Sequence, residues 1–155
     1  MKTRLQVFHY RCGKCRQRYD ALHLPDSHYG LFLMRTPIDG ELAILDALHD
    51  EVYDEVDTIL KKLPETRGMS ALKLSDLLQG VFSVACDPSA SGCEYSIVAE
   101  AACPGCGAAD SVSWVASEPP VIRELQLESP THKNWLRLSA SGKISAVRRR
   151  VASRK

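Results

Sequence analysis

The sequence predicts an α+β fold, in which a large helical insertion interrupts a small antiparallel sheet. Two C-x-x-C motifs, Cys12-Gly-Lys-Cys15 and Cys103-Pro-Gly-Cys106, are flanked by segments that alternate like strands. The 87 residues between the motifs, residues 16–102, contain long stretches in which apolar side chains recur at helical spacing. A chain of 155 residues is long enough for one domain that carries such an insertion.

The strands of the small sheet are expected around the two motifs. Residues 5–10 alternate in polarity and lead into the first motif, and residues 18–24 lead out of it. Residues 95–99 and 111–115 stand in the same relation to the second motif. After a pair of prolines, residues 121–127 alternate in a way that is typical of an edge strand.

The insertion and the C-terminal segment are expected to be mainly helical. Thr36-Pro37 is typical of a helix start, and apolar residues at helical spacing follow from Leu42 to Leu63, which predicts one helix of about 25 residues. Residues 70–79 predict a second helix. Residues 129–138 predict a short helix, and residues 144–151 a final one after a break.

These elements divide the chain into three parts. Residues 1–24 and 93–128 would form the sheet core, residues 25–92 the mainly helical insertion, and residues 129–155 a basic helical C-terminal segment. No apolar run approaches the ~20 residues of a membrane helix, and the first eight residues lack the apolar stretch of a secretory signal. We therefore expect a cytoplasmic protein that does not bind membranes.

The two C-x-x-C motifs predict a structural zinc site with Cys12, Cys15, Cys103 and Cys106 as ligands. Two thiolates at this spacing on a tight turn can point at one position, and two such turns supply a tetrahedral set of four sulfurs. Nearby glycines suit turns that need a positive φ; they are Gly13, Gly105 and Gly107. The longer loop adds roughly 1.4 kcal/mol of closure entropy, far less than the ~10–16 kcal/mol that structural zinc contributes.

Other uses of the thiols stay open at this stage. Iron takes the same four ligands, whereas a redox pair would need a helix directly after the motif, and disulfides suit secreted proteins. Cys86 and Cys93 bracket a turn-rich loop that follows the strand-like residues 81–84. They are interpreted as core thiols, and the alternatives are a labile pair across a hairpin or a second metal site with His132.

The segments from Phe8 to Cys15 and from Cys103 to Gly107 resemble the zinc-ribbon and rubredoxin-like group of folds. Arg16 departs from the pattern of that group, because many first knuckles carry glycine there, and so does the length of the insertion. Zinc ribbons commonly act as binding knuckles in transcription and translation proteins, so the resemblance implies an association with nucleic acid.

Charge is distributed unevenly along the chain, although the net charge is only +1. Residues 1–18 contain six basic side chains and no acidic one, and residues 133–155 contain eight and none. All 19 acidic residues lie between these blocks. Blocks of like charge favour an oppositely charged partner, which is either another molecule or the rest of the same chain.

We therefore expect a non-enzymatic zinc-ribbon protein that binds nucleic acid or a nucleic-acid-processing protein. Candidate phosphate contacts are Arg11, Lys14, Arg16, Arg18, Arg148, Arg149 and Arg150. Tyr10, Tyr19 and Trp135 are candidates for base stacking. The sequence contains no motif of a phosphate-binding loop, a zinc protease or a serine hydrolase, and four thiolates leave zinc no open position.

The acidic helix expected over residues 39–57 indicates an alternative function. This segment contains eight acidic residues and no basic one. Four of the aspartates would form a stripe on one helical face: Asp46, Asp50, Asp54 and Asp57. Such a stripe suits an inhibitor or immunity-type protein that docks a basic protein such as a toxin, and the same stripe could instead bind the chain's own arginine tail.

Overall fold

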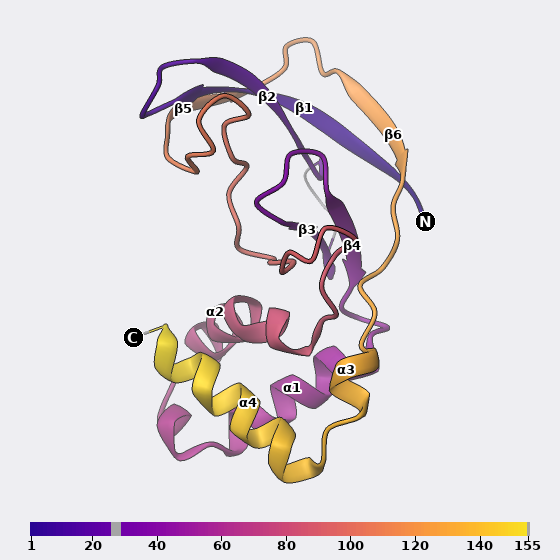
Figure 1. The fold of residues 1–155 in the computed structure, drawn as a ribbon, viewed down its shortest axis with the longest axis vertical. Coiled ribbons are helices and arrows are strands. Elements are labelled where there is room, and N and C mark those ends of the chain that lie inside the picture. Colours follow the sequence, from indigo (N-terminus) through magenta and orange to yellow (C-terminus); the bar gives the residue numbers. More distant parts are fainter. Residues whose placement is uncertain (26–28, 155) are drawn as a thin grey trace.

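The structure, a computed structural model, describes residues 1–25 and 29–154. Residues 26–28 of the predicted insertion and Lys155 of the predicted tail lie outside this description. Figure 1 shows three layers, with an antiparallel sheet above, a two-stranded hairpin in the middle and helices below. The predicted α+β fold class is confirmed.

The upper sheet is built around one long strand, β1. Its bounds and those of its neighbours are β1 Lys2–Cys12, β2 Arg18–His23, β5 Ser111–Ala116 and β6 Ile122–Gln126. All three neighbours pair antiparallel with β1. β2 lies along one edge of β1, and β5 and β6 follow each other along the opposite edge. The strands predicted at residues 5–10, 18–24, 111–115 and 121–127 are therefore present.

The middle layer is a hairpin of β3 Leu31–Arg35 and β4 Leu42–Asp46, and the prediction that the residues of β4 belong to a helix is wrong. Both faces of β4 are covered, because Ile44 packs toward the upper sheet and Leu45 packs toward the helices. A strand buried on both faces has a continuous apolar run, which periodicity cannot distinguish from a buried helix. The expected helix of residues 36–63 is consequently reduced to α1, Glu51–Lys62.

Helices form the lower layer: α1, α2 Ala71–Val81, α3 Lys133–Leu136 and α4 Ala140–Ser153. Two short 3₁₀ segments, η1 Pro64–Thr66 and η2 Phe82–Ala85, follow α1 and α2. The largest core cluster lies between these helices and the hairpin and includes Val56, Leu60, Phe82, Trp135 and Val147. The helices and the hairpin thus share one apolar core.

Three further expectations differ from the structure. Residues 81–84 are the end of α2 and η2, so no hairpin joins Cys86 and Cys93. Residues 95–99 form only an isolated bridge between Ser96 and Arg35. The break expected before the last helix is instead its start, because the Ser139 hydroxyl accepts a bond from the Gly142 amide as an N-cap.

No helix in the described ranges is long and apolar enough to cross a membrane.

Candidate metal centre

The fold brings the four cysteines of the two C-x-x-C motifs together. Their four Sγ atoms all lie within 4.8 Å of one another; the residues are Cys12, Cys15, Cys103 and Cys106. The Sγ atoms of Cys12 and Cys106 are 3.5 Å apart, and those of Cys15 and Cys103 are 3.6 Å apart. A tetrahedral ion with ~2.3 Å bonds to sulfur separates its ligands by ~3.8 Å, so the donor set fits zinc or iron.

The two knuckles repeat the same backbone hydrogen bonds. In the first, the Cys12 amide donates to the Gln17 carbonyl at 2.9 Å, and in the second the Cys103 amide donates to the Ala108 carbonyl at 2.8 Å. The return bonds are also equivalent, since the residue after the second cysteine of each motif, Arg16 or Gly107, donates to the carbonyl of the first. The site is therefore formed by two turns of one geometry.

This shared turn requires a left-handed backbone at one position in each knuckle. Gly107 has φ 75°, and its equivalent in the first knuckle, Arg16, has φ 67°. The expectation that Gly13 and Gly105 supply positive φ is wrong. Space is limited at both of these glycines, because an added Cβ would lie 3.1 Å from the Asp110 carbonyl at Gly13 and 1.9 Å from the Gln17 side chain at Gly105.

Each knuckle has one buried and one exposed thiol. Cys12 and Cys103 are buried beside Tyr10 and Tyr19, whereas Cys15 and Cys106 are exposed. The Cys15 and Lys14 amides point at the Cys12 sulfur, at 3.5 and 3.3 Å. Hydrogen bonds from these amides lower the pKa of Cys12 to about 6. At Cys15 a hydrogen bond from the Gln17 amide is outweighed by desolvation of the sulfur and by the neighbouring thiols, which raise its pKa to about 11.

The remaining thiols lie apart from the centre. Cys86 packs against the lower core, and its burial raises its pKa to about 12. His132 uses both ring nitrogens otherwise, with Nδ1 2.6 Å from the Ala85 carbonyl and Nε2 3.0 Å from Asp50. Within the described ranges, the only cluster of three or more potential ligands is the four-cysteine set, so neither Cys86 nor Cys93 joins a second one.

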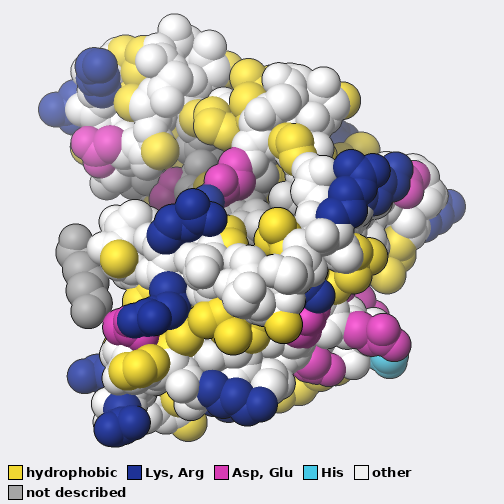
Figure 2. Space-filling view, turned by 60° about the horizontal axis from the view of Figure 1, so that its bottom comes forward, with side chains coloured by type: hydrophobic (Ala, Val, Ile, Leu, Met, Phe, Trp, Pro, Cys, Tyr) yellow, Lys and Arg dark blue, Asp and Glu magenta, His cyan; other side chains and the backbone are white. Residues whose placement is uncertain are grey.

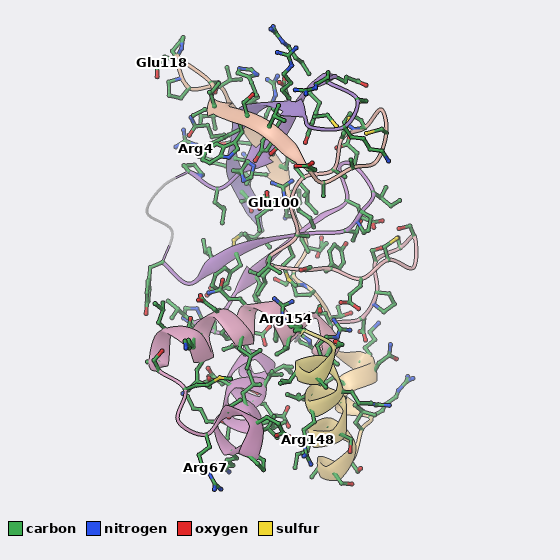
Figure 3. All side chains as sticks on the ribbon, turned by 90° about the vertical axis from the view of Figure 1, so that its left-hand side faces the viewer. Arg4, Arg67, Glu100, Glu118, Arg148 and Arg154 are labelled. Carbon is green, nitrogen blue, oxygen red and sulfur yellow. The ribbon has the colours of Figure 1, made fainter. Side chains whose placement is uncertain are left out.

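The first basic block keeps its charge exposed around the metal centre. Arg11 and Arg18 are direct partners in the register of β1 and β2, and Lys14 and Arg16 lie in the knuckle that joins these strands. Among residues 1–25 and 29–154, none of these four side chains forms an ion pair, and all four residues are exposed. In Figure 3, Arg4 lies in this upper sheet, far from Arg148 and Arg154.

The second basic block is partly neutralised within the molecule, although Arg149 is exposed and forms no ion pair in the described ranges. Arg148 donates to Glu65, and Arg150 forms a two-pronged pair with Glu94, with nitrogen–oxygen distances of 2.5 and 3.0 Å. Lys143 donates to Glu55 at 2.7 Å. These three pairs join α4 to the acidic middle of the chain. On the face shown in Figure 2, basic side chains are interspersed with acidic and hydrophobic ones and form no single patch.

The predicted aspartate stripe is not a continuous helical face. Asp46 ends β4 and binds His49, and Asp50 precedes α1, where it caps the Tyr53 amide and binds His132. Asp57 is paired with Lys61 at 2.6 Å. Among these four residues, Asp54 alone is an exposed helical carboxylate without an ion pair in the described part of the chain.

The aromatic residues expected to stack on bases are buried. Tyr10, Tyr19 and Trp135 are 5%, 7% and 1% exposed, which leaves no ring face for a ligand. Trp114 is instead 59% exposed on β5, at the edge of the upper sheet. The sequence pattern alone could not identify Trp114 as exposed, because polar and apolar residues alternate along its strand as in any half-buried strand. The ring is exposed because no further layer covers it.

Comparison of the chain with protein-family models, with curated proteins and with solved structures found no match. The four-cysteine cluster is therefore the feature on which any assignment rests, and it supports metal binding.

Proposed function

We propose that this chain is a non-enzymatic, zinc-containing protein that binds single-stranded nucleic acid through the basic surface around its metal centre. The zinc would be structural, because four thiolate ligands leave no position for a reacting water. Its role would be to hold two distant turns together and so to fix the positions of the basic side chains on the first of them.

The observation that carries this proposal is the like-charged pair of Arg11 and Arg18. The two residues are directly opposed across β1 and β2, and like charges in that arrangement destabilise a sheet. Asp20 lies on the same strand but its carboxylate is 2.7 Å from His9 Nδ1, and it forms no ion pair with either arginine. An anionic ligand that contacts both guanidinium groups would remove the repulsion.

Arg16 adds a second cost on the same turn. Its φ of 67° is a conformation that an arginine adopts only at an energetic expense of about 1–2 kcal/mol, and glycine occupies the equivalent place in the second knuckle. Strained residues concentrate at functional sites, where the side chain has a use that offsets the strain. Here the side chain supplies a third cation near Arg11 and Lys14.

The surface beside these cations can accept a chain of nucleotides. Arg11, Arg18 and His9 line a cavity of about 490 Å³ on the open face of the sheet. Trp114 lies on the adjacent edge strand, on the opposite face, because its register partner is Tyr10 rather than Arg11. A strand that bends over the β5 edge could place phosphates on the arginines and a base on the indole ring, a combination typical of single-strand binders.

Fluorescence anisotropy with labelled single-stranded RNA, single-stranded DNA and duplex DNA, at several salt concentrations, tests the proposal. The metal-loaded protein should bind the single strands, with an affinity that falls as salt rises. Each phosphate contact contributes ~0.7 to the slope of log affinity against log salt for single strands. Arg11→Gln combined with Arg18→Gln should therefore lower the slope by roughly 1.4.

Arg67→Gln provides a matched control, because Arg67 is an exposed cation at the opposite end of the molecule (Figure 3). This control should leave the slope unchanged, and so should Arg148→Gln if the protein stays folded. Metal analysis of the purified protein should find one zinc per chain. Visible absorbance typical of an iron–thiolate centre would show instead that iron occupies the site. Absence of binding at low salt, or equal losses in Arg67→Gln and the double variant, would reject nucleic-acid binding.

A further inference from the structure

We propose a second interaction surface, independent of the metal centre: a groove between α1, α2 and the start of β3 that docks a cationic amphipathic helix of another protein. The groove has a volume of about 610 Å³. We name it the α1–α2 groove and define it by Phe32, Leu48, Tyr53, Asp54, Leu74 and Leu78.

The groove is apolar at its base and along one rim. Phe32 and Tyr53 stack with their ring centres 6.1 Å apart, and both are half-buried. Burial raises the pKa of Tyr53 to about 12, as expected for a phenol in apolar surroundings. Leu74 and Leu78 lie one helical turn apart on α2, so they present a continuous aliphatic ridge.

Two large side chains at the mouth of the groove are exposed. Tyr29 is 88% exposed and Leu48 is 57% exposed. Leu48 packs over Gly30 so closely that a Cβ added to Gly30 would lie 2.5 Å from the Leu48 Cγ. Single exposed apolar residues are common, but here they adjoin a mainly apolar hollow. The arrangement suits an occupant that brings aliphatic side chains at helical spacing.

The charge of the groove selects a cationic occupant. Asp54 and Asp57 lie on the α1 rim, and the one basic residue of the lining, Lys61, is bound to Asp57. Asp54 forms no ion pair in the described ranges, so one carboxylate on this rim stays uncompensated. A partner with Lys or Arg beside its apolar residues would neutralise it, whereas an acidic or uncharged partner would not.

The groove differs from the aspartate stripe that the sequence suggested. Of the four residues of that stripe, only Asp54 and Asp57 reach the groove, while Asp50 is occupied by His132 and the Tyr53 amide. The affinity would therefore come from apolar burial in the groove, and the carboxylates would give orientation and selectivity.

A synthetic helical peptide of leucine and lysine, about 18 residues or five turns long, is a suitable probe. Its fluorescein-labelled form should bind the full chain in anisotropy titrations, and the same peptide with glutamate in place of lysine should not. Tyr29→Ser should weaken the binding at least about tenfold through lost apolar contact, without a change in the unfolding midpoint. Asp54→Lys should weaken it about tenfold at low salt and less at high salt.

Two matched variants control for non-specific adhesion. Leu72 is 73% exposed on α2 but lies outside the groove lining, so Leu72→Ser should not change the affinity. Asp76→Lys makes the same charge change as Asp54→Lys, but Asp76 lies on α2 and outside the groove lining. No binding of the leucine–lysine peptide, equal binding of the glutamate peptide, or equal effects of Tyr29→Ser and Leu72→Ser would overturn the proposal. Self-association of the chain that Tyr29→Ser abolishes would also overturn it, because the occupant would then be a second copy.

Discussion

The left-handed backbone of Arg16 makes a prediction that separates conformation from charge. Replacing Arg16 by glycine should stabilise the metal-loaded protein. Arg16 has φ 67°, and an L-residue in this region costs about 1–2 kcal/mol relative to its favoured conformations. Glycine avoids that cost but loses about 0.5–1 kcal/mol more backbone entropy on folding.

The difference between these two quantities is a gain of about 0.5–1 kcal/mol for Arg16→Gly. For a chain of this length, that gain raises the melting temperature by about 1–4 °C. Gly107 is the equivalent residue of the second knuckle, and no atom lies within 4 Å of a Cβ added to it. Gly107→Ala should therefore destabilise the protein by a similar amount, for purely conformational reasons.

Urea unfolding of the metal-loaded variants, followed by far-UV circular dichroism, measures both changes. Arg16→Ala is the control, because it removes the charge but retains the Cβ in the left-handed region. It should show no conformational gain. If the strain at Arg16 accompanies a binding role, Arg16→Gly should at the same time lower the salt slope for single-stranded nucleic acid by ~0.7.

The reasoning is refuted if Arg16→Gly is no more stable than Arg16→Ala, since both lack the guanidinium and differ only in the Cβ. It is equally refuted if Gly107→Ala unfolds at the same urea concentration as the original chain. Either result would mean that the two turns tolerate a side chain at positive φ without cost.

Three further predictions concern the metal, a buried ion pair and the lower core. Cys106→Ser should lose the bound metal while Cys86→Ser retains one per chain, as measured by atomic absorption; equal loss in both would remove the four-cysteine site. Burial opposes a charge on His132, but its bonds to Asp50 and to the Ala85 carbonyl outweigh burial and raise its pKa above 6.5. The stability from His132 should thus be complete below pH 6.5 and be lost as the pH rises through the raised pKa, and a His132→Gln variant that keeps the same pH slope would contradict this. Trp135→Ala should cost about 3–5 kcal/mol in urea unfolding, because the side chain is fully buried and its Nε1 donates to Glu55; a loss below about 1 kcal/mol would contradict that packing.

The clustering of the four cysteines was predictable because its information is local. A C-x-x-C turn places two sulfurs near one point regardless of the rest of the fold, so the grouping of Cys12 and Cys15 with Cys103 and Cys106 follows from spacing and valence. The long insertion between the motifs did not obscure it, because loop closure grows only with the logarithm of length. The flanking strands β1, β2 and β5 were predictable for the same local reason.

The hairpin of β3 and β4 could not be predicted from its own residues. Ala43, Ile44 and Leu45 are all buried because the upper sheet covers one face of β4 and the helices cover the other. This burial depends on the three-layer arrangement, which a local pattern does not contain. Leu42, Leu45 and Leu48 happen to match a helical spacing, and that match outweighed the short length of the apolar run.

In the sequence, both basic blocks are equally good candidates for phosphate contacts. Only the tertiary structure distinguishes them. On α4, Lys143, Arg148 and Arg150 pair with Glu55, Glu65 and Glu94, so these three charges serve the folded chain itself. The N-terminal block lies on the metal-centre turn and the two strands beside it, where no carboxylate pairs with Arg11 or Arg18 in the described ranges. A chain with a net charge of +1 therefore has an uncompensated basic end at the metal centre and an uncompensated carboxylate, Asp54, at the α1–α2 groove. Because the two sites share no residue, and the groove lies on α1, α2 and the hairpin whereas the basic surface lies on the upper sheet, neutralising one should leave binding at the other unchanged.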